Sequence, residues 1–339
     1  MSDAKFIIVG ENIHCTRIYK VNGKFVQEQP DGTYAVGYKA GAEQRLLPIP
    51  SSFKDGADWE AGKVKHCAVA IANGTGGDPV LKEKGIDYLA CLAQRQEQSG
   101  ATYLDINVDE FSSDLDARVS AMTWTVEQVQ KTATIPMSID SSNMDVMKAG
   151  LAACDASKGR PMVNSVSLER ADAIGIAADA GAVVIASAAG ESGLPATREE
   201  RLANIARLMT TLRDAGFEDG AIHIDPLVFP ISVDGRNGVE FLETVKAIRA
   251  TYGPDVHIVA GLSNVSFGMP KRKLINQVFA RLAVDSGADG GIVDPMQINS
   301  DILAGLDTES EPFQLARALL LGEDDFGMDY ITATRDGRL

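Results

Sequence analysis

The fold class is decided by Tyr103-Leu-Asp-Ile-Asn-Val108, the stretch 114–134 and Met137-Ser-Ile139. The first and last of these are short apolar runs, each bounded by polar turns. Apolar residues in 114–134 recur every three or four positions, as in a helix that lies on a sheet. The segment therefore predicts a strand, a helix and a second strand.

The same alternation continues along the chain in both directions. Several expected strands follow a glycine that fits a helix stop, such as Gly100 and Gly287. Eight strands alternating with helices match a (β/α)8 TIM barrel in number and length, and an open doubly wound sheet is the alternative. The strands are expected at 6–9, 103–108, 137–139, 162–166, 183–186, 222–224, 256–260 and 291–293.

A long insert follows the first strand. About residues 17–79 separate this strand from the helix expected at about 81–99. Within the insert, Pro30-Asp-Gly32 predicts a turn that joins 24–29 and 33–39 into a hairpin. A loop of this length is uncommon without a function, so a lid or a docking site for a partner stands beside a plain surface elaboration. With this insert, residues 1–339 are predicted to form a single barrel domain.

Composition and charge exclude several classes of protein. The chain has 32 basic and 47 acidic residues and a net charge of −15, so we expect it to bind neither nucleic acid nor an anionic membrane. No apolar run reaches the ~18 residues of a membrane span, and the first residues do not resemble a signal peptide. Four widely spaced cysteines do not indicate a disulfide framework. We therefore expect a soluble, cytoplasmic protein.

Polar residues lie at the carboxyl ends of the expected strands. Any one of them could simply cap the next helix, since Asp, Asn and Ser are preferred caps. Buried carboxylates are costly without a partner, however, and the carboxyl ends of barrel strands share one face. Polar ends on seven of the eight strands therefore favour a binding site. The residues concerned are Glu11, Asn12, Asp105, Asn107, Asp140, Asn164, Asp225, Ser263, Asn264 and Asp294.

These motifs occur in an order that resembles the pterin-binding methyltransferases. This family includes the methyltetrahydrofolate:corrinoid protein methyltransferases and the folate module of cobalamin-dependent methionine synthase. The resemblance covers residue 6 to about 295, apart from the insert. It rests on Ile7-Ile-Val-Gly-Glu-Asn-Ile13, Leu104-Asp-Ile-Asn-Val108, Ser138-Ile-Asp-Ser-Ser-Asn143, Met162-Val-Asn-Ser165, Ile224-Asp-Pro226 and Gly261-Leu-Ser-Asn-Val-Ser266.

The resemblance implies roles for particular residues. Asp140, Asn164 and Asp225 match the residues that hold the pterin ring, and Asn264 matches the asparagine near N5, the nitrogen that carries the methyl group. Arg272 is linked more loosely to the folate end of the site. The chemistry agrees, because a carboxylate can accept hydrogen bonds from the exocyclic amine and the ring N–H of a pterin at once.

Three further residues complete the predicted binding set. Asp105 and Asn107 are expected beneath the ligand or behind the residues that contact it, and Glu11 is expected at the end of the first strand. The predicted catalytic residues are Asn264 and Asp225. Asn264 would donate a hydrogen bond toward N5 as charge develops there, with Asp225 and water fixing the network.

The resemblance also implies cofactors and partners. The substrate would be tetrahydrofolate or its methyl derivative, and the cobalamin would be carried by a separate corrinoid protein, because the corrinoid signature Asp-x-His-x-x-Gly is absent. Relatives form homodimers, so a homodimer is expected. His14-Cys15 and His66-Cys67 suggest zinc, but adjacent residues of an extended segment point to opposite faces, so no metal site is predicted.

Two alternative functions remain open. Dihydropteroate synthase shares the barrel and the pterin pocket, but it carries a Ser-Arg-Lys element where this chain has Ser263-Asn264-Val265. The other alternative is a module that binds pterin or a corrinoid protein without catalysis. The sequence does not specify the direction of methyl transfer or the original methyl source.

Overall fold

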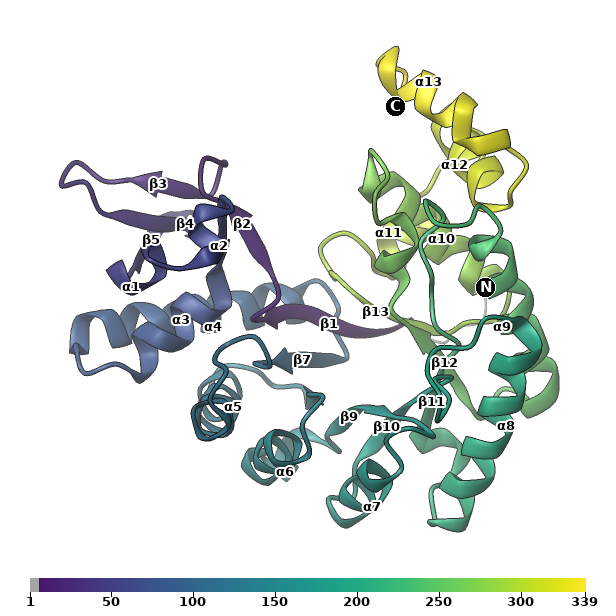
Figure 1. Cartoon of the computed structure of the whole chain (residues 1–339), viewed down its shortest axis with the longest axis horizontal. Helices are drawn as coiled ribbons and strands as arrows, with labels where there is room; N and C mark the ends of the chain where they lie inside the picture. The colour runs from purple at the N-terminus through teal and green to yellow at the C-terminus, as the bar shows by residue number, and fades with distance from the viewer. Residues whose placement is uncertain (1–5) are drawn as a thin grey trace. The chain divides into compact units, whose positions relative to one another are not determined.

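The structure is a computed structural model that describes residues 6–339. Eight strands form a closed barrel in the order β1-β13-β12-β11-β10-β9-β8-β7, which confirms the predicted TIM barrel and excludes the open sheet (Figure 1). The barrel strands are β1 (Ile7–His14), β7 (Tyr103–Asn107), β8 (Met137–Asp140), β9 (Met162–Val166), β10 (Val183–Ser187), β11 (Ile222–Asp225), β12 (His257–Ala260) and β13 (Gly290–Val293).

Strand boundaries agree with the sequence prediction to within one residue or so, except at β1. This strand continues to His14, and both Ile13 and His14 are buried. Glu11 and Asn12 therefore lie within the strand instead of following it, which corrects the prediction. The backbone N–H of Asn12 donates to the side-chain oxygen of Gln96 at 3.0 Å.

The chain divides into two compact units, which we describe separately. The N-terminal unit comprises residues 10–98 and 103–161, and the C-terminal unit comprises the start of β1, residues 99–102 and residues 162–339. The prediction that the chain is one domain stays a prediction.

The insert of the N-terminal unit is structured throughout. β3 (Val26–Glu28) and β4 (Tyr34–Ala40) form the predicted hairpin, with Val26 opposite Val36. A strand that was not predicted, β5 (Glu43–Ile49), pairs with β4 and completes an antiparallel sheet of three strands. The remaining short elements are β2 (Ile18–Lys20), β6 (Lys63–Lys65), α1 (Ser51–Lys54), α2 (Ala57–Glu60) and α3 (His66–Thr75).

The sheet of the insert lies on α3 and α4 (Pro79–Gln98). The two helices approach closely because Gly85 has no side chain: a Cβ there would lie 2.3 Å from the carbonyl oxygen of Ala70. His66 and Cys67 begin α3, so the assumption that this pair lies in an extended segment was wrong. The unit is completed by α5 (Leu115–Val129), α6 (Met144–Ala153) and η1 (Ala156–Lys158).

The C-terminal unit contains five consecutive parallel strands, β9 to β13, with helices between them. Apolar side chains of these strands, such as Val184 and Ile224, are completely buried. No helix among residues 6–339 has both the length and the apolar character needed to cross a bilayer. The helices are α7 (Asp172–Asp179), α8 (Arg198–Asp214), η2 (Asp219–Ala221), α9 (Asn237–Tyr252), η3 (Leu262–Ser266), α10 (Arg272–Asp285), α11 (Ser300–Ala304), α12 (Glu311–Leu320), η4 (Asp325–Gly327) and α13 (Met328–Arg335).

Candidate functional site

Four polar side chains meet at the ends of β1, β7 and β8 in the N-terminal unit. We call His14, Asp105, Asn107 and Asp140 the carboxylate cluster. Asn107 stands opposite Asp140 in the register of β7 and β8, and its side-chain nitrogen donates to Asp140 Oδ2 at 3.0 Å. Nε2 of His14 lies 2.8 Å from Asp105 Oδ2. Three of the predicted pterin-binding residues are thus brought together, and His14 joins them.

Burial gives this cluster unusual electrostatics. Burial and the neighbouring charge of Asp105 raise the pKa of Asp140 to about 7, against the opposing effects of His14 and the Asn107 hydrogen bond. Burial disfavours the charged form of His14, but the hydrogen bond and charge of Asp105, together with Asp140, raise its pKa. The protonation of Asp140 is therefore sensitive to its neighbours near neutral pH.

A layer of hydrogen bonds supports the cluster from the following loops. The Asp109 carboxylate accepts from the hydroxyl of Ser141 at 2.5 Å and from the backbone N–H of Ser142 at 2.7 Å, while its own N–H donates to Asn107 Oδ1. The cap of α6 is Asn143, which accepts from the N–H groups of residues 145 and 146. Helix capping is therefore not the role of Asp140.

The carboxylate cluster contains a set of atoms that could hold a cation. One donor atom from each of His14, Asp105 and Asp140 lies within 4.8 Å of the other two. His14 and Asp105 already bond to one another, and Asp140 already accepts from Asn107. We therefore assign no metal to these residues, and the prediction that the protein has no metal site stays a prediction.

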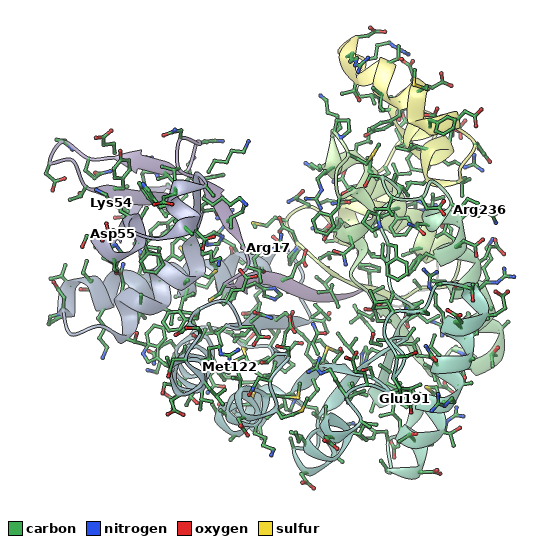
Figure 2. The ribbon with its side chains drawn as sticks, viewed as in Figure 1. Arg17, Lys54, Asp55, Met122, Glu191 and Arg236 are labelled. Carbon is green, nitrogen blue, oxygen red and sulfur yellow. The ribbon has the colours of Figure 1, made fainter. Side chains whose placement is uncertain are left out.

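Glu11 takes part in a separate ion pair. Its carboxylate contacts the guanidinium of Arg17, whose Nε also donates to the Glu11 carbonyl oxygen at 3.2 Å. Figure 2 labels Arg17 among the side chains of the structure. The pair links β1 to the start of the insert. A contact between Glu11 and a pterin stays a prediction.

In the C-terminal unit, Asp225 ends β11 and is held by its own loop. Its Oδ1 accepts from the backbone N–H of Leu227 at 2.8 Å. Leu227 has φ = 67°, in the left-handed region that is unfavourable for a leucine, and such strain tends to occur at functional sites. Burial raises the pKa of Asp225 to about 6, although the Leu227 N–H and the charge of Arg201 lower it.

Asn264 lies in η3, after β12. Its side-chain amide forms no hydrogen bond within residues 6–339. A Cβ on Gly261 would lie 3.0 Å from Nδ2 of Asn264, so glycine provides the room that this amide occupies. The amide is therefore available to a ligand.

Arg272 stabilises the loop that carries Asn264. Its Nε donates to the Ser266 hydroxyl and its Nη2 donates to the Ser263 carbonyl oxygen, each at 3.0 Å, and the guanidinium lies 4.5 Å from the centre of the Phe267 ring. These contacts favour the interpretation that Arg272 belongs to the network around the site. A direct contact with folate stays a prediction.

The other strand ends of this unit have different roles. Asn164 lies in β9 and is half-buried, and its peptide bond to Ser165 is cis. Asp294 accepts from the backbone N–H of Met296 and from the side-chain nitrogen of Gln297 at 2.6 Å. Its carboxylate therefore stabilises the loop after β13.

Sequence reasoning missed Arg201 of α8, which is only 2% exposed. The sequence does place Arg201 at helical spacing from apolar residues. Arg201 shares the buried face of the helix with Ile205, Leu208 and Leu212, which follow it by 4, 7 and 11 positions. A charged residue on an apolar helix face needs an explanation, because arginine is almost never fully buried without a partner.

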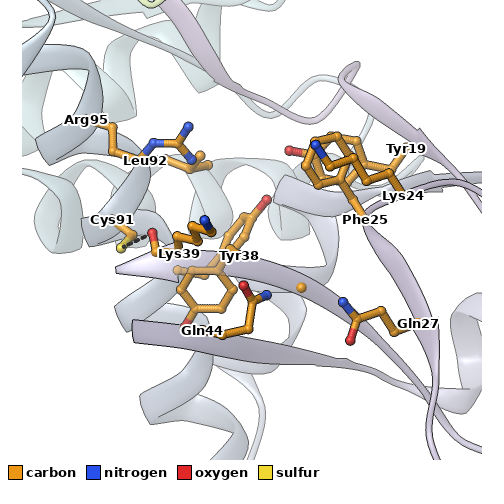
Figure 3. A pocket seen from close by; sticks show the side chains of 12 residues that line it. Tyr19, Lys24, Phe25, Gln27, Tyr38, Lys39, Gln44, Cys91, Leu92 and Arg95 are labelled. Atoms are coloured by element: carbon orange, nitrogen blue, oxygen red, sulfur yellow. Dashed lines mark hydrogen bonds between the residues drawn. The ribbon is translucent and has the colours of Figure 1, made fainter. Parts of the chain in front are cut away.

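The insert contains a cavity of about 480 Å³ over the sheet and α4 (Figure 3). Tyr19 stacks on Phe25 along one side, with ring centres 4.6 Å apart, and the cations Lys24, Lys39 and Arg95 also line the cavity. The predicted site residues do not line it. A lid or docking role of the insert stays a prediction.

The predicted residues thus fall into two groups, one in each unit. The N-terminal unit brings together Asp105, Asn107 and Asp140, with Glu11 on β1. The C-terminal unit carries Asn164 and Asp225 on barrel strands, Asn264 in η3 after β12, and Arg272 at the start of α10. That both groups contact the same ligand stays a prediction.

Comparisons with known proteins agree on one family. Residues 70–294 match the family described as pterin binding enzyme. The chain is 30% identical over 273 residues to the methylcorrinoid:tetrahydrofolate methyltransferase of Eubacterium limosum, covering 78% of this chain and 94% of the relative. It is 30% identical over 246 residues to methionine synthase of Mycobacterium tuberculosis, covering 67% of this chain but only 20% of that protein.

Solved structures show the same fold. Dihydropteroate synthase from Stenotrophomonas maltophilia has a TM-score of 0.52 at 20% identity, over 67% of this chain and 87% of that structure. The synthase from Xanthomonas albilineans, in complex with 7,8-dihydropteroate, has a TM-score of 0.51 at 21% identity, over 72% and 87% of the two chains. At such identity the likeness extends to the fold alone.

Proposed function

Because this chain belongs to the pterin-binding enzymes, we propose that it transfers a methyl group between N5 of tetrahydrofolate and the cobalt of a corrinoid protein. The observation that carries this proposal is the amide of Asn264, which is held after β12 without a side-chain hydrogen bond in residues 6–339. The named activity of the relative from Eubacterium limosum supports the same reaction.

The residues of the carboxylate cluster fit a pterin. Asp140 would accept hydrogen bonds from N–H groups of the pterin, since an ionised carboxylate can accept more than one in a charge-assisted way. Asp225 is half-buried and would accept from the ring N–H and the exocyclic amine on the pyrimidine edge of the pterin. Asn164 provides an amide that can both donate and accept. Asn107 would orient Asp140 through its hydrogen bond, and Asp105 would hold His14 in the cluster.

In methyl transfer to cobalt, the leaving group is N5 of the pterin, which is a poor leaving group because it departs with an electron pair. When the methyl group leaves N5 for cobalt, the N5–CH3 bond breaks and its electron pair stays on N5, which then takes up a proton. Asn264 would stabilise the charge that develops on N5, and one such preorganised donor contributes about 3 kcal/mol. In the reverse direction N5 attacks the methyl group and loses its proton, with the same residues stabilising the same transition state.

The corrinoid supplies a nucleophilic cobalt or a methyl donor, and this chain would receive it from a partner. The four histidines, His14, His66, His223 and His257, do not lie in a corrinoid-binding signature. A homodimer and a cytoplasmic location stay predictions.

The reaction can be tested with purified protein, tetrahydrofolate and methylcobalamin. We expect loss of the methylcobalamin absorption spectrum that depends on both the protein and tetrahydrofolate, together with formation of methyltetrahydrofolate. Tight folate binding without turnover, even with a methylated corrinoid protein, would instead identify a binding module. Condensation of p-aminobenzoate with a pterin pyrophosphate would identify a synthase.

A further inference from the structure

Arg201 is a buried cation without a direct partner. Its guanidinium forms no hydrogen bond or ion pair within residues 6–339, and Nε is shielded from solvent with no acceptor. The two nearby acids are engaged elsewhere: Glu240 pairs with Arg236 at 2.8 Å, and Asp225 accepts from Leu227. A buried charge that lacks acceptors is costly, so an acceptor from a ligand would compensate it.

The position of Arg201 is well defined. Thr197 and Glu200 form a capping box that fixes the first turn of α8, where Arg201 lies. The guanidinium stacks over the ring of Phe229, with 4.8 Å between its central carbon and the ring centre. It is also close enough to Asp225 for its positive charge to lower the pKa of that carboxyl group. Arg201, Phe229 and Asp225 thus form a cation, an aromatic face and an acid in one region of the C-terminal unit.

We propose that Arg201 is a ligand-binding residue whose guanidinium donates hydrogen bonds to the ring carbonyl oxygen of the pterin, next to Asp225. This inference rests on the proposed function, in which Asp225 contacts the pyrimidine edge of the pterin. On that edge the ring N–H lies between the exocyclic amine and the carbonyl group. A carboxylate that accepts from the N–H therefore has the carbonyl oxygen beside it, and that oxygen needs a donor.

A hydrogen bond from Arg201 to the pterin carbonyl oxygen would explain why this arginine is buried on the apolar face of α8. A lone carboxylate at this edge would recognise the amine and the N–H, and it would lose the N–H in a 4-amino compound, but it would leave the carbonyl oxygen of the pterin without a donor. A guanidinium has only hydrogen-bond donors, so it can donate to a carbonyl oxygen, whereas an amine at that position would meet it with a second donor. Arg201 would therefore make the site selective for 2-amino-4-oxo pterins over 2,4-diamino pteridines.

The test is a binding comparison between two variants and two probes. The variants are Arg201→Gln and the control Arg207→Gln, which removes an exposed arginine of the same helix, α8, that pairs with Glu191 in the preceding loop. The probes are pterin and 2,4-diaminopteridine, titrated by calorimetry into folded protein. We expect R201Q to weaken pterin about 10- to 100-fold and to change diaminopteridine binding much less, and R207Q to change neither.

If R201Q lost the same affinity for both probes, or lost affinity for neither, the proposal would be overturned and Arg201 would have a structural role only. If R201Q does not fold, the conservative Arg201→Lys replaces it, because lysine keeps the charge but not the planar fork. Wild-type protein that binds pterin and diaminopteridine alike would also overturn the proposal. Wild-type protein that binds neither pterin nor tetrahydrofolate would mean failure of the proposed function itself, which separates the two outcomes.

Discussion

The strand ends of the two units differ in how their polar groups are used. In the N-terminal unit, each member of the carboxylate cluster takes part in a hydrogen bond within the cluster, and Asp109 and Ser141 support it from behind. In the C-terminal unit, the amide of Asn264 and the guanidinium of Arg201 form no such bonds within residues 6–339. The difference indicates that the N-terminal unit provides a preorganised hydrogen-bond acceptor, Asp140, and that the C-terminal unit provides hydrogen-bond donors, Asn264 and Arg201, for a ligand.

The strongest test of this contrast is Asn264→Ala. If the amide acts only on developing charge at N5, turnover should fall about 10²- to 10³-fold while the Kd for tetrahydrofolate changes little. Single-turnover methyl transfer and equilibrium binding measure the two quantities separately. Equal losses in both would make Asn264 a simple binding residue, and unchanged turnover would remove its catalytic role.

The next test concerns the preorganised side. Asp140→Asn retains the shape of the side chain but removes the charge and one of the two acceptors, so tetrahydrofolate should bind about 100-fold more weakly. Asp294→Asn is the matched control, because that strand-end carboxylate bonds to its own loop through Met296 and Gln297. The control should retain wild-type affinity. Equal affinity in D140N and wild type would show that Asp140 does not contact the pterin.

These contrasts also show what could be read from the sequence. Hydrophobic periodicity and the polar strand ends predicted the barrel and the face on which Asn107 and Asp140 lie, because the carboxyl ends of parallel strands share one face. The pairing of Asn107 with Asp140 was found only in the structure. The length of β1, the strand β5 and the helix at His66 depend on tertiary packing and were missed. Arg201 shows a third case, since its helical spacing was visible but its lack of a partner requires the folded structure.

A pH titration sharpens the role of the cluster. Only ionised Asp140 can accept two N–H bonds, and its pKa is about 7, so tetrahydrofolate affinity should be full above pH 7 and fall as the pH drops through 7. His14→Gln removes a positive charge that lowers this pKa, so the midpoint should move to higher pH. Calorimetry between pH 5.5 and 9, a range of about two units either side of that pKa, measures the shift. An unchanged midpoint in H14Q would show that His14 does not control Asp140.

The smallest expected effect comes from the supporting layer. Ser141→Ala removes the hydroxyl that donates to Asp109 at 2.5 Å, and Ser141 is completely buried, so the protein should lose about 1–2 kcal/mol of unfolding free energy. Asp109 still accepts from Ser142 at 2.7 Å and still orients Asn107 through its backbone N–H, so folate affinity should fall only about two- to fivefold. Chemical denaturation and calorimetry measure the two effects. An affinity loss as large as that of D140N would mean that Asn107 and Asp140 depend on this serine for their geometry, and the acceptor would then be less preorganised than the hydrogen bonds within the cluster indicate.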